Sequence, residues 1–200
     1  MKIDNIVKDY LWAFELPEID NKILRDSCLN IEGQLKEMFP AISEEQGYGS
    51  FTTHYHKKYN LFSFRCTELH KLYSSLSKTI NLLVNDDNYY IRCWVNIFRK
   101  GENISWHNHW EQEYKTYHGY YCVNTEGKHE SYTDYVIPNE LMKRITSKDG
   151  LCVFGKSQGD RHKTYEWNNE GERITIAFDV IPFFAIRNNN IMHNYLPILK

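Results

Sequence analysis

Residues 89–110, "YYIRCWVNIFRKGENISWHNHW", contain two strand-like segments joined by a turn. In the first segment apolar residues alternate with polar or aromatic ones, namely Ile91, Cys93, Val95 and Ile97 against Arg92, Trp94 and Asn96. A period of two predicts a β-strand with one apolar face. Lys100 and Gly101 predict a turn, after which "ISWHNHW" begins a second strand. A β-rich region is therefore expected to start near residue 89.

Strand-like segments continue to residue 181, whereas the preceding part of the chain has a helical pattern. Further strands are expected at 117–124, 129–137, 150–156 and 173–181. Upstream, apolar residues recur at helical spacing in 19–38 and in 68–85, where Thr67 is a candidate N-cap. The stretch between these helices, 43–60, predicts a long loop with some extended structure. Helices followed by short strands favour a β-sandwich or jelly roll buttressed by two helices.

The composition is that of an ordinary globular domain. Of the 200 residues, 42% are hydrophobic and 25% are charged, which is typical of a folded chain rather than a disordered one. No repeat or linker divides the sequence, so we expect a single domain over 1–200. Within it, a helical lead-in (1–88) precedes the β core (89–181), and a partly apolar C-terminal tail (182–200) docks on the domain or on a partner.

Charge and cysteine content exclude several classes of protein. The formal net charge of −2 gives no general attraction to nucleic acid or to an anionic membrane, so neither is expected as a partner. The first fourteen residues contain no apolar signal core, and no apolar run approaches the length that spans a membrane. Five widely spaced cysteines without a C-x-x-C motif argue against a disulfide framework and favour buried thiols in a reducing cytoplasm. A homodimer is left open.

Two histidines in the second strand form a candidate metal site. On a strand His107 and His109 point to the same face, roughly 7 Å apart along the chain, so both rings can reach one ion. The best candidate for a third ligand is His162 in "SQGDRHKTYEW", and Arg173 begins the next strand. The alternative is that the two histidines are merely solvated and that Arg173 is a surface charge. The order of these elements favours the metal site.

The order "WVNIFRKGENISWHNH … HGYYCVNT … GLCVFGKSQGDRHKT … ERITIAFDV" resembles the Fe(II)- and 2-oxoglutarate-dependent oxygenases. It is most similar to members of phage and marine bacterial type with the pattern W-x-N…G…H-x-H…S-G…H…R-x-S/T. The likeness covers about residues 89–181. It implies a mainly β fold, the double-stranded β-helix, which is a cupin-like jelly roll with iron at the mouth of the barrel.

The resemblance also implies an activity and a role for each matching residue. The enzyme would hydroxylate a substrate with Fe(II), 2-oxoglutarate and O2, and would release succinate. The iron ligands would be His107, His109 and His162. Arg173, with Thr175 two residues on, would hold the distal carboxylate of 2-oxoglutarate, because a guanidinium binds a carboxylate with two parallel hydrogen bonds. Further residues of the cosubstrate pocket would be Asn96 and Tyr121, or Tyr120 in place of Tyr121.

The sequence departs from the oxygenase pattern in two places. Most members use H-x-D/E…H, so the usual carboxylate position is occupied here by His109. A frame shifted by two residues gives His109-Trp110-Glu111, and Glu111 therefore remains an alternative to His107 as the third ligand. In addition, His118-Gly119 replaces the usual Ser-Gly after a stretch that is longer by a few residues. An insertion is therefore expected close to the site.

Two other functions remain open. The residues Gly101, His107, His109 and Glu113 also satisfy a cupin motif, so the chain could be a metal-binding cupin that does not use 2-oxoglutarate. The cupin pattern leaves Arg173 unexplained. The second alternative is a non-catalytic interaction domain with a degraded site. No residue pattern identifies the substrate.

Overall fold

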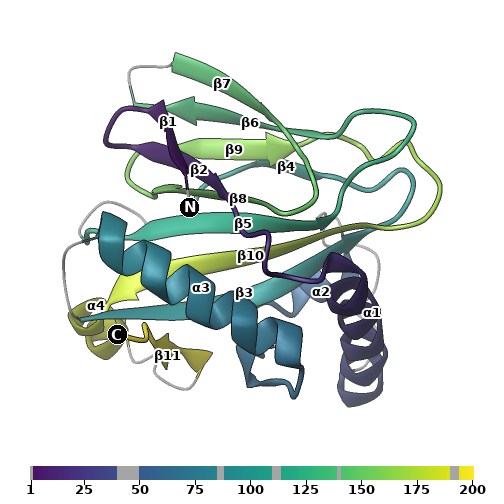
Figure 1. Cartoon of the computed structure of the whole chain (residues 1–200), viewed down its shortest axis with the longest axis horizontal. Helices are drawn as coiled ribbons and strands as arrows, with labels where there is room; N and C mark the ends of the chain where they lie inside the picture. The colour runs from purple at the N-terminus through teal and green to yellow at the C-terminus, as the bar shows by residue number, and fades with distance from the viewer. Residues whose placement is uncertain (1, 40–49, 85–87, 110–113, 139–140, 190–193) are drawn as a thin grey trace.

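The computed structural model describes residues 2–39, 50–84, 88–109, 114–138, 141–189 and 194–200. Two antiparallel β-sheets face each other (Figure 1). The larger sheet has the strand order β1 (Ile3–Val7), β2 (Leu11–Glu15), β8 (Leu151–Lys156), β5 (Tyr117–Asn124), β10 (Arg173–Pro182), β3 (Tyr89–Phe98) and β11 (Leu196–Pro197). The smaller sheet has the order β4 (Ile104–His107), β9 (Arg161–Thr164), β6 (Tyr132–Ile137) and β7 (Leu141–Thr146). The predicted mainly β jelly roll is confirmed.

Two long helices cover the face of the larger sheet that points away from the smaller one (Figure 1). They are α1 (Asn21–Met38) and α3 (Thr67–Leu83), and both bury an apolar stripe in the same cluster as strand β3. Helix α1 begins after Asp20, whose carboxylate accepts hydrogen bonds from two backbone N–H groups of the first turn. The two helices confirm the prediction, but Thr67 is not the N-cap. That position belongs to Cys66, whose side chain makes no capping bond, and Thr67 is the first helical residue.

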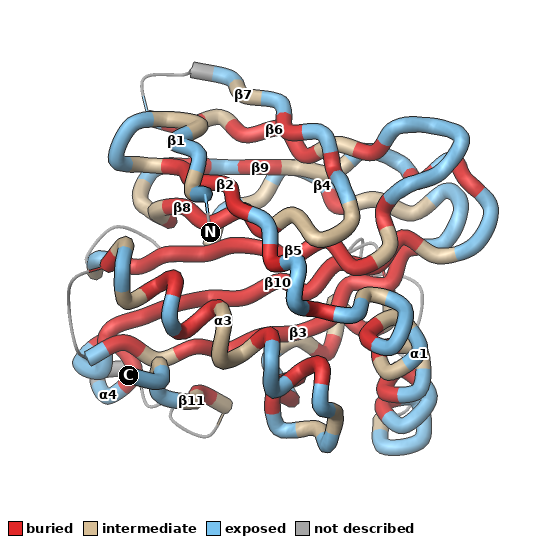
Figure 2. Tube along the Cα trace, in the orientation of Figure 1, coloured by how far each residue is buried: buried red, intermediate tan, exposed pale blue. Residues whose placement is uncertain are grey.

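Strand β3 shows why the period-two pattern was informative. Its apolar residues, Ile91, Cys93, Val95 and Ile97, are fully buried in the cluster beneath the helices. Four residues of the opposite face, Arg92, Trp94, Asn96 and Phe98, line a cavity between the two sheets. Figure 2 shows β3, β5 and β10 buried along almost their whole length, because helices cover one face and the smaller sheet covers the other. The centre of the larger sheet is therefore both core and cavity wall.

Several elements were not predicted from the sequence. The lead-in over 1–88 contains strands β1 and β2. The expected loop contains a short helix, α2 (Phe51–His54), and a 3-10 turn, η1 (Leu61–Ser63), follows the loop. Strands β7, β9 and β11 are additional, and helix α4 (Phe183–Asn189) follows β10. These elements are short, so an alternating pattern has too few residues to stand out. The C-terminal tail docks on the domain, where β11 pairs with β3 and Ile186 of α4 is buried.

All five cysteines are free thiols, and Cys93, Cys122 and Cys152 are fully buried as predicted. Among the described residues no helix is both long enough and apolar enough to cross a bilayer.

Candidate metal centre

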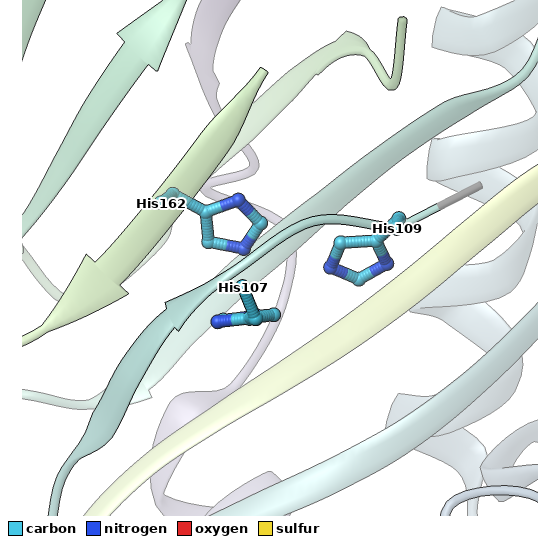
Figure 3. A group of neighbouring side chains, drawn as sticks. All are labelled: His107, His109 and His162. Atoms are coloured by element: carbon cyan, nitrogen blue, oxygen red, sulfur yellow. The ribbon is translucent and has the colours of Figure 1, made fainter. Parts of the chain in front are cut away.

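Three imidazole rings meet at the edge of the smaller sheet. His107 is the last residue of β4, His109 follows two residues later, and His162 lies on the neighbouring strand β9. The ring centroid of His107 is 4.2 Å from that of His162 and 5.5 Å from that of His109, and the remaining pair is 5.1 Å apart. Figure 3 shows the three side chains turned toward one another. One nitrogen of each ring lies within 4.8 Å of the other two.

The Nδ1 atom of each of these rings faces an acceptor. In His107 it donates to the backbone carbonyl of Ser105 at 2.9 Å, and in His109 it donates to Oδ1 of Asp179 at 2.6 Å. In His162 it lies 3.5 Å from Oδ2 of Asp160. Because metal-binding histidines usually donate their second ring N–H to a carboxylate or carbonyl, this pattern leaves the three Nε2 atoms for a metal ion.

Burial keeps two of these rings in the form that a metal requires. It lowers the pKa of His107 to about 4, with a further contribution from the neighbouring His109, and it lowers the pKa of His162. Both rings are therefore neutral at pH 7, and a neutral imidazole nitrogen is the metal ligand. Burial alone would raise the pKa of Asp179, but His109 and Arg92 hold it below its usual value, so this carboxylate stays ionised.

The donor set fits a divalent transition metal. Three ligands at about 2.1 Å from one ion lie roughly 3–4 Å apart, a spacing that small rotations of these side chains reach. Imidazole nitrogen suits iron, zinc, copper and nickel, and three protein ligands leave positions open for other molecules. The usual set of protein ligands for non-haem iron is two histidines and one carboxylate. The three side chains that meet here are all histidines, and the carboxylate of Asp179 is hydrogen-bonded to His109.

A fourth histidine, His118 on β5, extends the cluster. Its ring stacks on His109 and on His162 with centroids 4.5 and 4.7 Å apart. Its Nε2 lies 2.9 Å from Oδ2 of Asp160, which is also close to His162. His118, Asp160 and His162 form a second, fully buried group within ligand distance of one another. The side chain of His118 therefore supports the ring of His162 from the interior of the barrel.

Arg173 lies at the other end of the same cavity and is 2% exposed. The alternative of a surface charge is therefore wrong. Its Nε donates to Oγ of Ser131 at 2.7 Å, one of its terminal nitrogens is 3.4 Å from Oγ of Ser147, and the guanidinium packs over Phe98. Within the described part of the chain no carboxylate lies within ion-pair distance of it. A buried cation without a counter-ion is costly, and its presence in a cavity favours an anionic ligand.

The predicted cosubstrate residues divide into two groups. Thr175 and Asn96 lie opposite each other on β10 and β3, and both line the cavity beside Arg173. Tyr121 does not line the cavity. Its side chain points to the helical side of the sheet, where its hydroxyl donates to Asn21 of α1, and the alternate residue Tyr120 lines the cavity instead. Neighbouring residues of a strand face opposite ways, so only one of the two tyrosines could do so.

Glu111 and Glu113 lie outside the described residues, and so does Trp110. The structure brings His107, His109 and His162 together without testing Glu111 as an alternative. Three other charged residues at the site, Arg92, Asp160 and Asp179, were missed from the sequence. Two of them could have been found from their positions in the sequence. Asp160 is two residues before His162, and Asp179 is a charged residue in the largely apolar strand "RITIAFDV", on the same strand face as Arg173.

The sequence matches no protein-family model and no curated protein. Known structures, in contrast, share the fold. A Pseudomonas putida prolyl-4-hydroxylase is 12% identical with a TM-score of 0.57, over 90% of this chain and 96% of the hydroxylase. AviO1 from Streptomyces viridochromogenes Tue57 is 13% identical with a TM-score of 0.62, over 88% and 90% of the two chains.

A third structure of this fold is SnoN, a non-heme alpha ketoglutarate dependent epimerase of nogalamycin biosynthesis. It is 9% identical with a TM-score of 0.56, over 88% of this chain and 77% of the epimerase. Likeness at such low identity shows a shared fold. The fold that the sequence resemblance implied is therefore confirmed, and the chain is similar in architecture to the prolyl-4-hydroxylase, AviO1 and SnoN.

Proposed function

We propose that this protein is a non-haem Fe(II)- and 2-oxoglutarate-dependent oxygenase. The observation that carries the proposal is the position of Arg173. Its buried guanidinium, which has no carboxylate partner in the described residues, lies in the same cavity of about 1000 Å³ as the three histidines. A metal site alone would not need this cation. A metal site that binds a dicarboxylate through one end needs a cation for the other end.

In this proposal the residues of the cavity have separate roles in binding the metal and the cosubstrate. His107, His109 and His162 hold the iron, and Asp179 fixes the ring of His109. Arg173 binds the distal carboxylate of 2-oxoglutarate. The hydroxyl of Thr175 and the amide of Asn96 line the cavity between Arg173 and the three histidines. When iron, cosubstrate and O2 are bound, they supply the oxidation, with conversion of 2-oxoglutarate to succinate and CO2. The side chains orient the cosubstrate and exclude water.

Hydroxylation of the substrate is the outcome that we propose. The same fold also carries an epimerase that depends on the same cosubstrate, so the fold alone does not fix the outcome. Hydroxylation is the simplest result, because it needs only a C–H bond of the substrate near the metal and no further group from the protein.

Anaerobic titration with Fe(II) and then 2-oxoglutarate tests the proposal. We expect a weak visible charge-transfer band once both are bound. Arg173→Gln should abolish the band while the protein still binds Fe(II), because the substituted side chain is not a metal ligand. Arg144→Gln is the matched control, since it removes the same charge from an exposed side chain on the smaller sheet.

Two other results would contradict the proposal and favour the alternatives. Metal binding without a band in the unchanged protein would favour a cupin that does not use 2-oxoglutarate. Absence of metal binding would favour a non-catalytic interaction domain.

A further inference from the structure

The cavity has positively charged side chains at both ends. Strands β10 and β3 run side by side, with Arg173 opposite Phe98 at one end and Asp179 opposite Arg92 at the other. Asp179 is six positions along the strand from Arg173, which corresponds to about 20 Å. His109 contacts Asp179, so the metal centre lies close to the end at Arg92 and away from Arg173. If Arg173 holds the cosubstrate, the end at Arg92 remains for the substrate.

Arg92 at this far end is buried and contacts one carboxylate and two aromatic rings. One terminal nitrogen donates to Oδ2 of Asp179 at 2.8 Å, and the guanidinium lies between the rings of Trp94 and Tyr195 at 5.4 and 5.3 Å. The residue is only 9% exposed. Its Nε is nevertheless buried without a hydrogen-bond acceptor among the described residues. Arg92 lines the cavity, so its guanidinium places a buried positive charge at this end.

Two lysines add positive charge at the same end. Lys57 and Lys58 follow helix α2, line the cavity and are exposed. Among the residues that the structure describes, neither has a carboxylate within 4.0 Å. The described lining contains one acid, Asp179, which already accepts from His109 and Arg92. The charge of the two lysines is therefore uncompensated at this end, which favours an anionic ligand.

We propose that this second cationic end binds a carboxylate or phosphate group of a small substrate and so presents the rest of that molecule to the metal. The inference rests on the proposed oxygenase function and names its substrate class. The cavity volume of about 1000 Å³ is at the upper end of the range that holds drug-sized ligands, so a small anionic molecule fits beside a five-carbon cosubstrate.

Matched pairs of small compounds test this inference on the protein loaded with Fe(II) and saturating 2-oxoglutarate under anaerobic conditions. Benzoate against benzamide tests a carboxylate, and phenyl phosphate against phenol tests a phosphate. Calorimetry gives the binding constants. We expect the anionic member of at least one pair to bind about 10-fold more tightly than its neutral partner. The preference should weaken as ionic strength rises, because exposed charges are screened.

The double variant Lys57→Gln/Lys58→Gln should weaken binding of the preferred anion about 5-fold, the ordinary effect of two exposed charges. Lys22→Gln/Lys78→Gln makes the same change of net charge on exposed helical positions away from the cavity, and should bind the anion as the unchanged protein does. Equal binding of anionic and neutral members in both pairs, or equal weakening in both double variants, would overturn the inference.

A second titration separates this inference from the proposed oxygenase function. The same pairs are titrated into metal-free protein carrying Arg173→Gln, in which the cosubstrate end has lost its cation. Anion preference that depends on Lys57 and Lys58 should persist there. If the anion preference persists while no charge-transfer band forms in the unchanged protein, the result supports the anion site and contradicts the proposed oxygenase function.

Discussion

Nδ1 of His109 lies 2.6 Å from Oδ1 of Asp179, although 70 positions separate the two residues in the sequence. Asp179 is 2% exposed and also accepts a hydrogen bond from Arg92. In the usual facial triad of non-haem iron enzymes, a carboxylate binds the metal directly. In this chain the carboxylate would act through an imidazole, whose orientation it fixes and whose basicity it raises.

Asp179→Asn should therefore weaken metal binding by about 10- to 100-fold, the usual effect of removing such a carboxylate. Competition between the protein and a chromophoric chelator for Co²⁺ would measure the loss. Asp134→Asn is the matched control, because Asp134 is also buried and paired with an arginine, but it lies away from the three histidines. Equal metal affinity of Asp179→Asn and the unchanged protein would contradict a role for Asp179 at the metal.

His162→Ala should abolish both metal binding and succinate production, because it removes one of three convergent rings. Glu111→Ala should have a mild effect if His107, His109 and His162 are the ligands. Metal content per chain and succinate formation are the measurements. An equal loss in the two variants would show that Glu111, which lies outside the described residues, is a ligand and that the three-histidine set is wrong.

Arg173→Met should stabilise the metal-free protein against urea by about 1 kcal/mol or more, because a buried cation without a counter-ion costs more than an apolar side chain of similar length. The two hydroxyls that it leaves, those of Ser131 and Ser147, can bond each other at 3.4 Å. Arg144→Met should have the opposite effect, since it leaves the buried Asp134 without its ion pair. Lower stability of Arg173→Met would indicate that the guanidinium is compensated without a ligand.

How much of the fold could be predicted depended on the length of each element. Strand β3 and strand β10 each have ten residues, enough for a period of two or a continuous apolar run to be visible. Strands β4 and β9 have four residues each, and β9 was not predicted because "RHKT" is polar at most of its positions. Its pairing with β4 and β6 holds it in the sheet. That pairing is tertiary information, which no local pattern carries.

In the candidate site, too, local relationships could be predicted from the sequence and contacts between distant strands could not. Spacing and strand phase placed His107 with His109 and aligned Arg173 with Thr175, because these relationships are local. The contacts of Asp179 with Arg92 and His109 depend on the register between β10 and β3 and on the path of the chain after β4. One sequence does not determine that register. The sequence does not separate Tyr121 from Tyr120 for a related reason: which face of β5 points inward is decided by its neighbours in the sheet.

Gly119→Ala should lower the free energy of unfolding by at least about 2 kcal/mol, because a Cβ at this position has no space. It would lie 2.3 Å from the backbone oxygen of Val153 and 2.6 Å from the ring of Phe178. Gly33→Ala in helix α1 is the control: nothing lies within 4 Å of its Cβ, so it should raise the stability by about 0.5–1 kcal/mol. Urea unfolding of both variants checks the pair, and a tolerated Gly119→Ala would contradict the close packing of β5.

Acidification should destabilise the protein through His56, which packs on the ring of Trp94 and donates from Nδ1 to the carbonyl of Thr53. Burial lowers the pKa of His56 to about 4. The Thr53 carbonyl and Asp179 raise this pKa, whereas Arg92 and Lys57 lower it. Between about pH 6.5 and pH 4 the unfolded chain binds a proton that the folded chain does not, so stability is full above this window and falls as the pH falls through it.

The contribution of His56 to the pH dependence of the free energy of unfolding can be measured by comparing variants of the metal-free protein. Between pH 7.5 and pH 5 the His56 contribution should be about 2 kcal/mol. Urea unfolding of His56→Gln should show a pH dependence smaller than that of the unchanged protein by this amount, while titration of the other histidines is common to both and cancels. His129→Gln, which removes an exposed histidine, is the matched control. If His56→Gln and the unchanged protein lose equal stability at pH 5, the His56 ring is not held neutral by the fold.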